Sequence, residues 1–256
     1  MDSLNAYLWL AIALFAWVVM WYAIAIFKKR NDVADVAWGL GFVWLAWLAF
    51  FQGGGNHLAL VVNALITVWG LRLAWHIYTR NQGKPEDFRY AQWRKQWKHF
   101  YLRSFFQVFL LQGFILYVIA WPVLFINLTV PSPLGWLDYA GIGIWLVGFS
   151  FEAIGDYQLK LFKKNPANRG KIITTGLWRY TRHPNYFGDA LQWWGVFTMA
   201  CALPSGWMTL ISPVLMTYLL RYVSGVPMLE RKYEGHPEFE AYKRETSVFF
   251  PLPPKS

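Results

Sequence analysis

The densest concentration of hydrogen-bonding residues lies at positions 175–189, directly before an apolar stretch. This run, Thr-Gly-Leu-Trp-Arg-Tyr-Thr-Arg-His-Pro-Asn-Tyr-Phe-Gly-Asp, joins two arginines, an imidazole, a Pro-Asn turn and a terminal acid. Cations that meet the first N–H groups of a helix form an anion pocket. The sequence therefore predicts an anion-binding site where this loop enters the next helix.

Four acids lie in or beside apolar runs, where an ionised side chain is costly and usually marks a site. They are Asp35, Glu152, Asp156 and Asp189. Glu152 and Asp156 are four residues apart and share a helix face, so their charges repel unless donors reach them. Two sources of donors stay open: the ribose or amide groups of a ligand, or an ion-pair cluster with Lys160 or Arg179.

Basic and aromatic residues surround the end of another apolar run. Arg72, His76 and Arg80 share one helix face. They would either meet an anionic ligand or, most simply for Arg80, extend to lipid phosphates. Residues 90–101 then mix aromatic and basic side chains, a pattern typical of an amphipathic helix at the membrane interface.

The elements that must position these residues are long apolar helices. Apolar residues make up 56% of the 256 residues and charged residues only 15%, against about 25% charged in soluble domains. A membrane-crossing helix needs about 20 apolar residues. Seven stretches are predicted to cross: 4–27, 36–51, 58–77, 104–126, 134–155, 187–203 and 207–223. Within the fifth, Gly141, Gly143 and Gly148 follow no strand, which favours close helix packing over a dinucleotide fingerprint.

The distribution of the 24 Lys and Arg residues predicts the topology. All of them fall in the inner loops, the tail, or the inward ends of the third and seventh stretches. The positive-inside rule then places the N-terminus outside and the C-terminus in the cytoplasm. The formal charge of +10 thus reports membrane orientation and does not indicate nucleic acid. The first stretch has its cations after it, unlike a secretory signal, so we expect it to be retained.

These motifs together resemble the steroid 5-alpha-reductase family, and its bacterial membrane members in particular. Glu152-Ala-Ile-Gly-Asp156-Tyr is similar to the family's Asn-x-x-x-Asp-Tyr. Positions 171–180 match its Arg-x-x-x-x-Gly-Leu-Phe-x-Tyr, apart from Lys at the first place and Trp at the eighth, and positions 185–189 resemble its Asn-x-x-Gly-Glu. The resemblance implies an NADPH-dependent oxidoreductase that reduces a carbon–carbon double bond conjugated to a ketone in an apolar, steroid-like substrate.

The resemblance also implies roles for particular residues. The predicted cofactor-binding residues are Arg72, Lys84, Glu152, Asp156, Lys171, Tyr180, His183, Asn185, Asp189 and Arg221. Spacing from Arg72 puts Asp35 and Trp69 where the family has a Glu and a Tyr that hydrogen-bond the substrate's carbonyl, so these two are the predicted catalytic residues. Asp35 would act as a protonated donor, assisted by Trp69. Two family residues beyond Arg221, a His and a Tyr, are Gly225 and Leu229 here.

The expected organisation is one membrane-embedded domain over residues 1–256, with substrate-side helices in 1–130 and cofactor-side helices and the tail in 131–256. The substrate would enter from the lipid phase of a bacterial inner membrane. The sequence indicates no protein or nucleic-acid partner. The single cysteine, Cys201, allows no internal disulfide, and we expect no metal.

Two other classes stay open. The Arg-His-Pro-x-Tyr loop is also similar to that of integral-membrane methyltransferases of the isoprenylcysteine carboxyl type, which use S-adenosylmethionine. A non-enzymatic lipid-binding or scaffold protein would explain the basic loops and aromatic belts. It would not explain why Glu152, Asp156 and Asp189 gather with an Arg-His-Pro loop at one membrane face.

Overall fold

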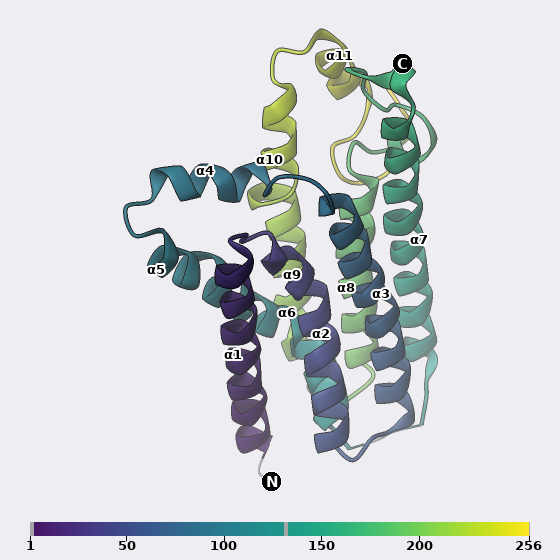
Figure 1. Ribbon diagram of the computed structural model, residues 1–256. Helices are drawn as coiled ribbons and strands as arrows, with labels where there is room; N and C mark the ends of the chain where they lie inside the picture. Colours follow the sequence, from purple (N-terminus) through teal and green to yellow (C-terminus); the bar gives the residue numbers. More distant parts are fainter. Residues whose placement is uncertain (1–2, 131–132, 256) are drawn as a thin grey trace. The chain divides into compact units, whose positions relative to one another are not determined.

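A computed structural model describes residues 3–130 and 133–255, and every regular element in these ranges is a helix (Figure 1). The chain divides into two compact units, Met1–Leu134 and Gly135–Ser256. The expected single domain, with substrate-side helices in 1–130 and cofactor-side helices in 131–256, stays a prediction.

The first unit is built from three long helices and a fourth that is interrupted. Its elements are α1 (Ser3–Lys28), α2 (Val33–Gln52), α3 (His57–Asn81), α4 (Phe88–Gln96), α5 (Phe100–Ser104), the π-helix η1 (Phe105–Leu110) and α6 (Leu111–Leu128). Helix α2 is central, since it packs on α1, α3 and α6. Figure 1 shows the short α4 running crosswise to α1.

Glycines bring α2 and α3 into close contact. A Cβ atom on Gly39 would lie 2.7 Å from the carbonyl oxygen of Gly70, and one on Gly70 would lie 2.6 Å from that of Gly39. Only a residue without a side chain allows backbones to approach this closely. Asp35 lies one turn before this crossing on α2, so the crossing fixes the level at which its carboxylate enters the unit.

The second unit pairs two long helices and wraps a tail around their ends. Its elements are α7 (Trp136–Lys164), η2 (Pro166–Asn168), η3 (Gly176–Arg179), α8 (Pro184–Ala200), η4 (Gly206–Leu210), α9 (Ile211–Tyr218), η5 (Leu219–Val223), α10 (Val226–Glu230), η6 (Arg231–Tyr233) and α11 (Pro237–Glu245). Helices α7 and α8 form its main contact.

The packing of α7 on α8 confirms part of the glycine prediction. Cβ atoms on Gly141 and Gly148 would lie 2.6 and 2.7 Å from the carbonyl oxygens of Gly195 and Gly188. A Cβ on Gly143 would meet nothing within 4 Å, so this glycine is outside the contact. The repeat of seven residues on both helices keeps these glycines on one seam.

Within the described residues, six helices are long and apolar enough to cross a membrane: Leu4–Lys28, Val33–Gln52, His57–Asn81, Phe100–Leu128, Trp136–Lys164 and Gly206–Tyr233. By length and composition the chain is therefore a multi-pass integral membrane protein. The sixth predicted span, 187–203, corresponds to α8, which has 17 residues. Such a helix is about 25 Å long, shorter than the hydrocarbon core of about 30 Å. The count of seven spans and the orientation stay predictions.

Candidate functional site

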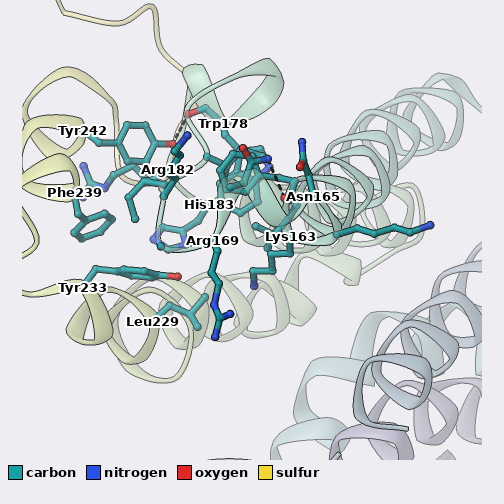
Figure 2. A pocket seen from close by; sticks show the side chains of 18 of the residues that line it. Lys163, Asn165, Arg169, Trp178, Arg182, His183, Leu229, Tyr233, Phe239 and Tyr242 are labelled. Carbon is teal, nitrogen blue, oxygen red and sulfur yellow. Dashed lines mark hydrogen bonds between the residues drawn. The ribbon is translucent and has the colours of Figure 1, made fainter. Parts of the chain in front are cut away.

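A large cavity of the second unit lies where α7 ends and the chain turns back. Its volume is about 570 Å³, and its wall comes from the end of α7, the following loop, Trp178, and the segments that hold Glu230 and Phe239. This volume is within the range of small-molecule sites, about 300–1,000 Å³. Figure 2 shows its aromatic side chains on one side, Arg182 and His183 at its centre, and Lys163 and Asn165 on the opposite side.

The centre of this cavity is a three-residue cluster. Glu230 accepts hydrogen bonds from Arg182 Nε at 2.8 Å and from His183 Nε2 at 3.0 Å. Arg182 also donates to the carbonyl oxygen of Thr246 at 2.7 Å. Because Arg182 meets both α10 and the end of α11, it fixes the tail that closes the cavity. Glu230 was not predicted from the sequence. The available signal was its place directly before the basic pair Arg231 and Lys232.

One ring nitrogen of His183 is hydrogen-bonded, and the other has no partner among the described residues. Burial lowers the pKa of His183, and the hydrogen bond to Glu230 opposes this only in part, so the imidazole is neutral near pH 7. With Glu230 as acceptor, Nε2 carries the proton and Nδ1 is an acceptor. Nδ1 is buried and has no hydrogen-bond partner among the residues that the structure describes. A buried polar atom without a partner is expected where a ligand completes the site.

Two kinds of side chain line the rest of the cavity. Its basic rim consists of four exposed cations: Lys163, Lys164, Arg169 and Lys171. Its aromatic wall consists of Trp178, Tyr233, Phe239 and Tyr242 (Figure 2). The Tyr242 hydroxyl donates to the carbonyl oxygen of Trp178, which joins the tail to η3. Such a cavity suits a flat aromatic ligand that carries several negative charges.

A second polar group lies along the contact of α7 with α8. Gln192 donates to Glu152 at 2.6 Å, and Asn185 donates to Asp156 at 3.0 Å. Asp189 is also buried here, at 8% exposed. Amide side chains of the protein itself thus reach both acids, a source of donors that the sequence did not suggest because Gln192 lies in an apolar run.

The predicted cofactor residues of this unit therefore fall in different places. Lys171 and His183 line the cavity, whereas Glu152, Asp156, Asn185 and Asp189 follow the contact of α7 with α8. Tyr180 is 44% exposed, and its carbonyl oxygen accepts from Leu252 of the tail. Arg221 lies over the ring of Tyr222 at 4.7 Å, and its charge contributes to lowering the pKa of His183.

In the first unit, Asp35 is an acceptor for two donors from α4. The Tyr90 hydroxyl donates to its Oδ1 at 2.7 Å, and Arg89 donates to its Oδ2 at 2.9 Å. The Arg89 contact is an ion pair, with 26% and 15% of the two side chains exposed. This geometry suits a carboxylate that holds Tyr90 in place. The role of Asp35 as a protonated donor to the substrate stays a prediction.

Burial and the Asp35 carboxylate both raise the pKa of Tyr90, so its hydroxyl remains protonated. Burial also disfavours the charged form of Asp87, but hydrogen bonds from Arg89 outweigh this effect and lower its pKa. Sequence inspection assigned residues 90–101 to an interfacial helix and so missed Tyr90. The available signal was the run Glu-Asp-Phe-Arg-Tyr, which places charged groups directly before a buried aromatic residue.

Further ion pairs attach this segment to the turn between α1 and α2. Arg30 pairs with Asp32 at 2.7 Å, and Asp32 accepts from the backbone N–H of Asp87 at 3.1 Å. Arg94 pairs with Glu86 at 2.9 Å. Because Glu86 also accepts from the backbone of the turn at 2.6 Å, α4 is held from both sides.

The other predicted residues of the first unit are dispersed. Trp69 is 1% exposed and packs edge-on against Phe42, with ring centroids 5.3 Å apart. Phe42 follows Asp35 by seven residues, which is about 10 Å along the helix. Arg72 is partly buried on α3, and Lys84 is exposed in the turn after it. The role of Trp69 beside Asp35 thus stays a prediction.

Comparison with known proteins places the chain in a family. A family model described as protein of unknown function (DUF1295) matches residues 21–246, and the chain belongs to this family. An uncharacterized protein of Schizosaccharomyces pombe is 23% identical over 91% of this chain and 76% of its own length. No solved structure matches the chain.

Shorter matches connect the chain to two kinds of enzyme. A probable O-methyltransferase of Ustilaginoidea virens is 34% identical over 35% of this chain and 30% of its own length. The 3-oxo-5-alpha-steroid 4-dehydrogenase 1 of Rattus norvegicus is 29% identical over 38% of this chain and 37% of its own length, and that of Bos taurus is 26% identical over 39% and 38%. The chain thus spans about a third of each of these enzymes. Its distant similarity to them indicates an enzyme, and the similarity to a reductase is as expected from the motifs.

Proposed function

We propose that this member of the DUF1295 family is an NADPH-dependent reductase. Its reaction would be the reduction of a carbon–carbon double bond conjugated to a ketone in an apolar, steroid-like substrate, as in 3-oxo-5-alpha-steroid 4-dehydrogenases. The observation that carries the proposal is the cavity of the second unit, which joins a basic rim to an aromatic wall. The partial similarity to steroid dehydrogenases supports the same reaction class.

The chemistry of the cavity fits this cofactor. A nicotinamide dinucleotide phosphate has two bases, two linked phosphates and a third phosphate on a ribose. The four rim cations, Lys171 among them, would bind phosphates through charge-assisted hydrogen bonds. Trp178 and Tyr233 offer aromatic surfaces to a base. The orphaned Nδ1 of His183 would accept a hydrogen bond from an amino or hydroxyl group.

The bound cofactor would supply the hydride, and the residues of the chain would supply orientation and a dry environment. Arg182 and Glu230 hold His183 and the tail, so they keep the cavity in shape. Negative charge develops on the ketone oxygen as the hydride arrives, and a donor placed there stabilises it by about 3 kcal/mol. In the first unit, Asp35 would act by positioning the hydroxyl of Tyr90 for the substrate's polar end.

A membrane setting suits this substrate, because an apolar enone partitions into lipid. We propose seven spans with the N-terminus outside, in a bacterial inner membrane, so that the basic cavity faces the cytoplasm. The polyanionic cofactor would then enter from water and the substrate from lipid. No nucleic-acid or protein partner is part of this proposal.

The second candidate is an S-adenosylmethionine-dependent methyltransferase of the isoprenylcysteine carboxyl type. It is favoured by the 34% identity over 91 residues to a probable O-methyltransferase and by Glu230, an acid that would attract a cationic methyl donor. However, S-adenosylmethionine has a positively charged sulfonium and no phosphate. Four rim cations against one acid in the cavity therefore favour the phosphorylated cofactor.

Titration of the purified protein in detergent separates the candidates. We expect NADPH to bind at least about tenfold more tightly than NADH, since one further phosphate meets the rim and tenfold corresponds to one charge-assisted contact. A steroid enone should then cause oxidation of NADPH. Binding of S-adenosylmethionine without binding of NADPH would support the methyltransferase and overturn the proposal.

A further inference from the structure

Exposed cations gather where α1 ends and along the segment of α4 and α5. This basic surface consists of Lys28, Lys29, Lys95, Lys98 and Arg103, all of which are exposed. The segments that contain them are in contact, because Arg94 of α4 donates to the carbonyl oxygen of Lys29 at 3.1 Å. The hydroxyl of Tyr22 on α1 likewise donates to the carbonyl oxygen of Tyr101 on α5 at 2.9 Å. The basic surface therefore lies at one end of a helix that is long and apolar enough to cross a membrane.

The acids of the first unit do not neutralise the basic surface, because arginines already pair with them. Within residues 3–130, every acid forms an ion pair with an arginine, and the pairs are Arg30–Asp32, Arg89–Asp35, Arg89–Asp87 and Arg94–Glu86. Among the residues that the structure describes, none of the cations of the basic surface has an acid as its partner. Like charges on one surface repel each other and attract anions.

Aromatic packing holds the basic surface in a fixed arrangement. The rings of Trp93 and Trp97 stack with centroids 5.0 Å apart, and both pack on the buried cluster that includes Ala25 of α1 and Tyr90. The guanidinium group of Arg103 lies over the ring of Trp97 at 5.3 Å. Because the segment is already ordered, the binding of an anion costs little conformational entropy.

Apolar side chains beside these cations indicate the class of anion. Phe27 is 87% exposed directly before Lys28, and Leu102 is 61% exposed directly before Arg103. Figure 1 shows α4 running crosswise to α1, as expected of a helix that lies along a membrane surface. A soluble polyanion leaves the apolar side chains in water. A phospholipid offers a phosphate to the cations and an acyl chain to their apolar neighbours.

We propose that the basic surface binds the headgroups of anionic phospholipids in the leaflet at which α1 ends. The lipid phosphates accept charge-assisted hydrogen bonds from the lysines and Arg103, and Phe27 and Leu102 lie among the acyl chains. Bound lipid offsets the repulsion between the cations and so stabilises α4, whose Tyr90 donates to Asp35. The proposal does not depend on the reaction of the enzyme, since the basic surface shares no residue with the cavity of the second unit.

The experiment measures how well three competitors displace a fluorescent phosphatidylglycerol from the full-length protein in detergent, by fluorescence anisotropy. The competitors are phosphatidylglycerol, phosphatidylcholine with the same acyl chains, and inorganic phosphate. Each cation near an anionic surface contributes about fivefold, so we expect phosphatidylglycerol to bind at least about tenfold more tightly than phosphatidylcholine. Equal displacement by the two lipids would overturn the proposal. Displacement by inorganic phosphate as effective as that by phosphatidylglycerol would show a site for soluble anions and would also overturn it.

Variants then assign the preference to the basic surface. In the triple variant Lys95→Gln, Lys98→Gln and Arg103→Gln, we expect the preference for phosphatidylglycerol to fall to about twofold. The matched control removes the same number of charges from exposed cations of the tail, by Arg231→Gln, Arg244→Gln and Lys255→Gln. This control should keep the preference of the wild type. An equal loss in both triple variants would show that net charge alone sets the preference and would overturn the site.

A second variant keeps the test decisive if the first triple variant does not fold. Lys28→Gln with Lys29→Gln removes two cations of the basic surface and leaves the sequence of α4 and α5 unchanged. We expect its preference for phosphatidylglycerol to fall at least about threefold below that of the wild type. An unchanged preference in this variant would contradict the proposed site.

Discussion

The cluster around Asp35 and the cavity of the second unit differ in how their charged side chains are arranged. Around Asp35 in the first unit, the carboxylates receive donors from Arg89, Arg30 and Arg94, so charge is neutralised within the protein. In the second unit, the cavity has one acid in its centre and four exposed cations on its rim. Charge that is paired internally fixes a segment in place, whereas exposed charge on the rim of a cavity attracts a ligand of opposite sign.

The largest effect is expected when one charge is removed from the cluster around Asp35. Asp35→Asn removes one of the two carboxylates that Arg89 contacts and the charged acceptor of the Tyr90 hydroxyl, so we expect the free energy of unfolding to fall by about 2–3 kcal/mol. Steroid enone turnover should also fall, while NADPH affinity is retained. Unfolding in mixed detergent, a turnover assay and a cofactor titration measure the three effects.

Glu245→Gln is the control for Asp35→Asn, because Glu245 is exposed on α11. Its stability and turnover should match the wild type. Unchanged turnover in Asp35→Asn would reject any catalytic or positioning role for Asp35.

Reversing charge on the open rim tests the other half of the comparison. The double variant Arg169→Glu with Lys171→Glu replaces attraction to phosphate by repulsion, so we expect NADPH affinity to fall about a hundredfold, or about 2.7 kcal/mol. Stability should change little, because these side chains are exposed. Isothermal titration calorimetry at low and high salt measures the NADPH affinity of the double variant and of the wild type. High salt screens the rim charges, so it should reduce the difference between the two affinities.

The control for the rim is Arg244→Glu, an exposed cation on α11 that does not line the cavity. If the double variant binds NADPH with the affinity of the wild type, the cavity is not the cofactor site.

The helix packing of the second unit is tested at the close contact of α7 with α8. Gly148→Ala would place a methyl group 2.7 Å from a carbonyl of α8, so we expect a loss of about 1–3 kcal/mol in the free energy of unfolding. Gly143→Ala is the matched control, since its Cβ meets nothing within 4 Å and alanine favours the helix by about 1 kcal/mol. Equal stability of the two variants would contradict the packing of α7 on α8.

The smallest expected effect concerns protonation of His183. Its pKa in the folded protein is lowered mainly by burial, whereas an unfolded His titrates near about 6.5. The neutral ring therefore stabilises the fold above about pH 6.5, and this stability declines as the pH falls toward the folded pKa. His183→Gln should remove this part of the pH dependence. Unfolding curves between pH 5 and about 7.5 test this, and an unchanged slope would contradict the burial effect.

Most of the fold followed from apolar run lengths, while the composition of the sites followed only in part. Within the described residues, six of the seven predicted spans recur as helices long and apolar enough to cross a membrane, because each apolar run must satisfy its own backbone in lipid. Lys171 and His183 were found from a local motif and do line one cavity. Tyr90, Arg89 and Glu230 were missed, because each meets its partner across 47 residues or more. Hydrophobic periodicity contains no information about such distant pairs.

The sequence by itself determined an all-helical membrane protein with acids and cations concentrated in a few segments, since length and hydropathy act locally along the chain. The tertiary structure decided which of those charges meet. It places Arg89 and Tyr90 beside Asp35, and an amide donor from α8 beside Glu152. It also places four cations around one cavity. The physical reason is that the energy of a buried charge depends on the few atoms within hydrogen-bond reach, and only the packing of helices places those atoms.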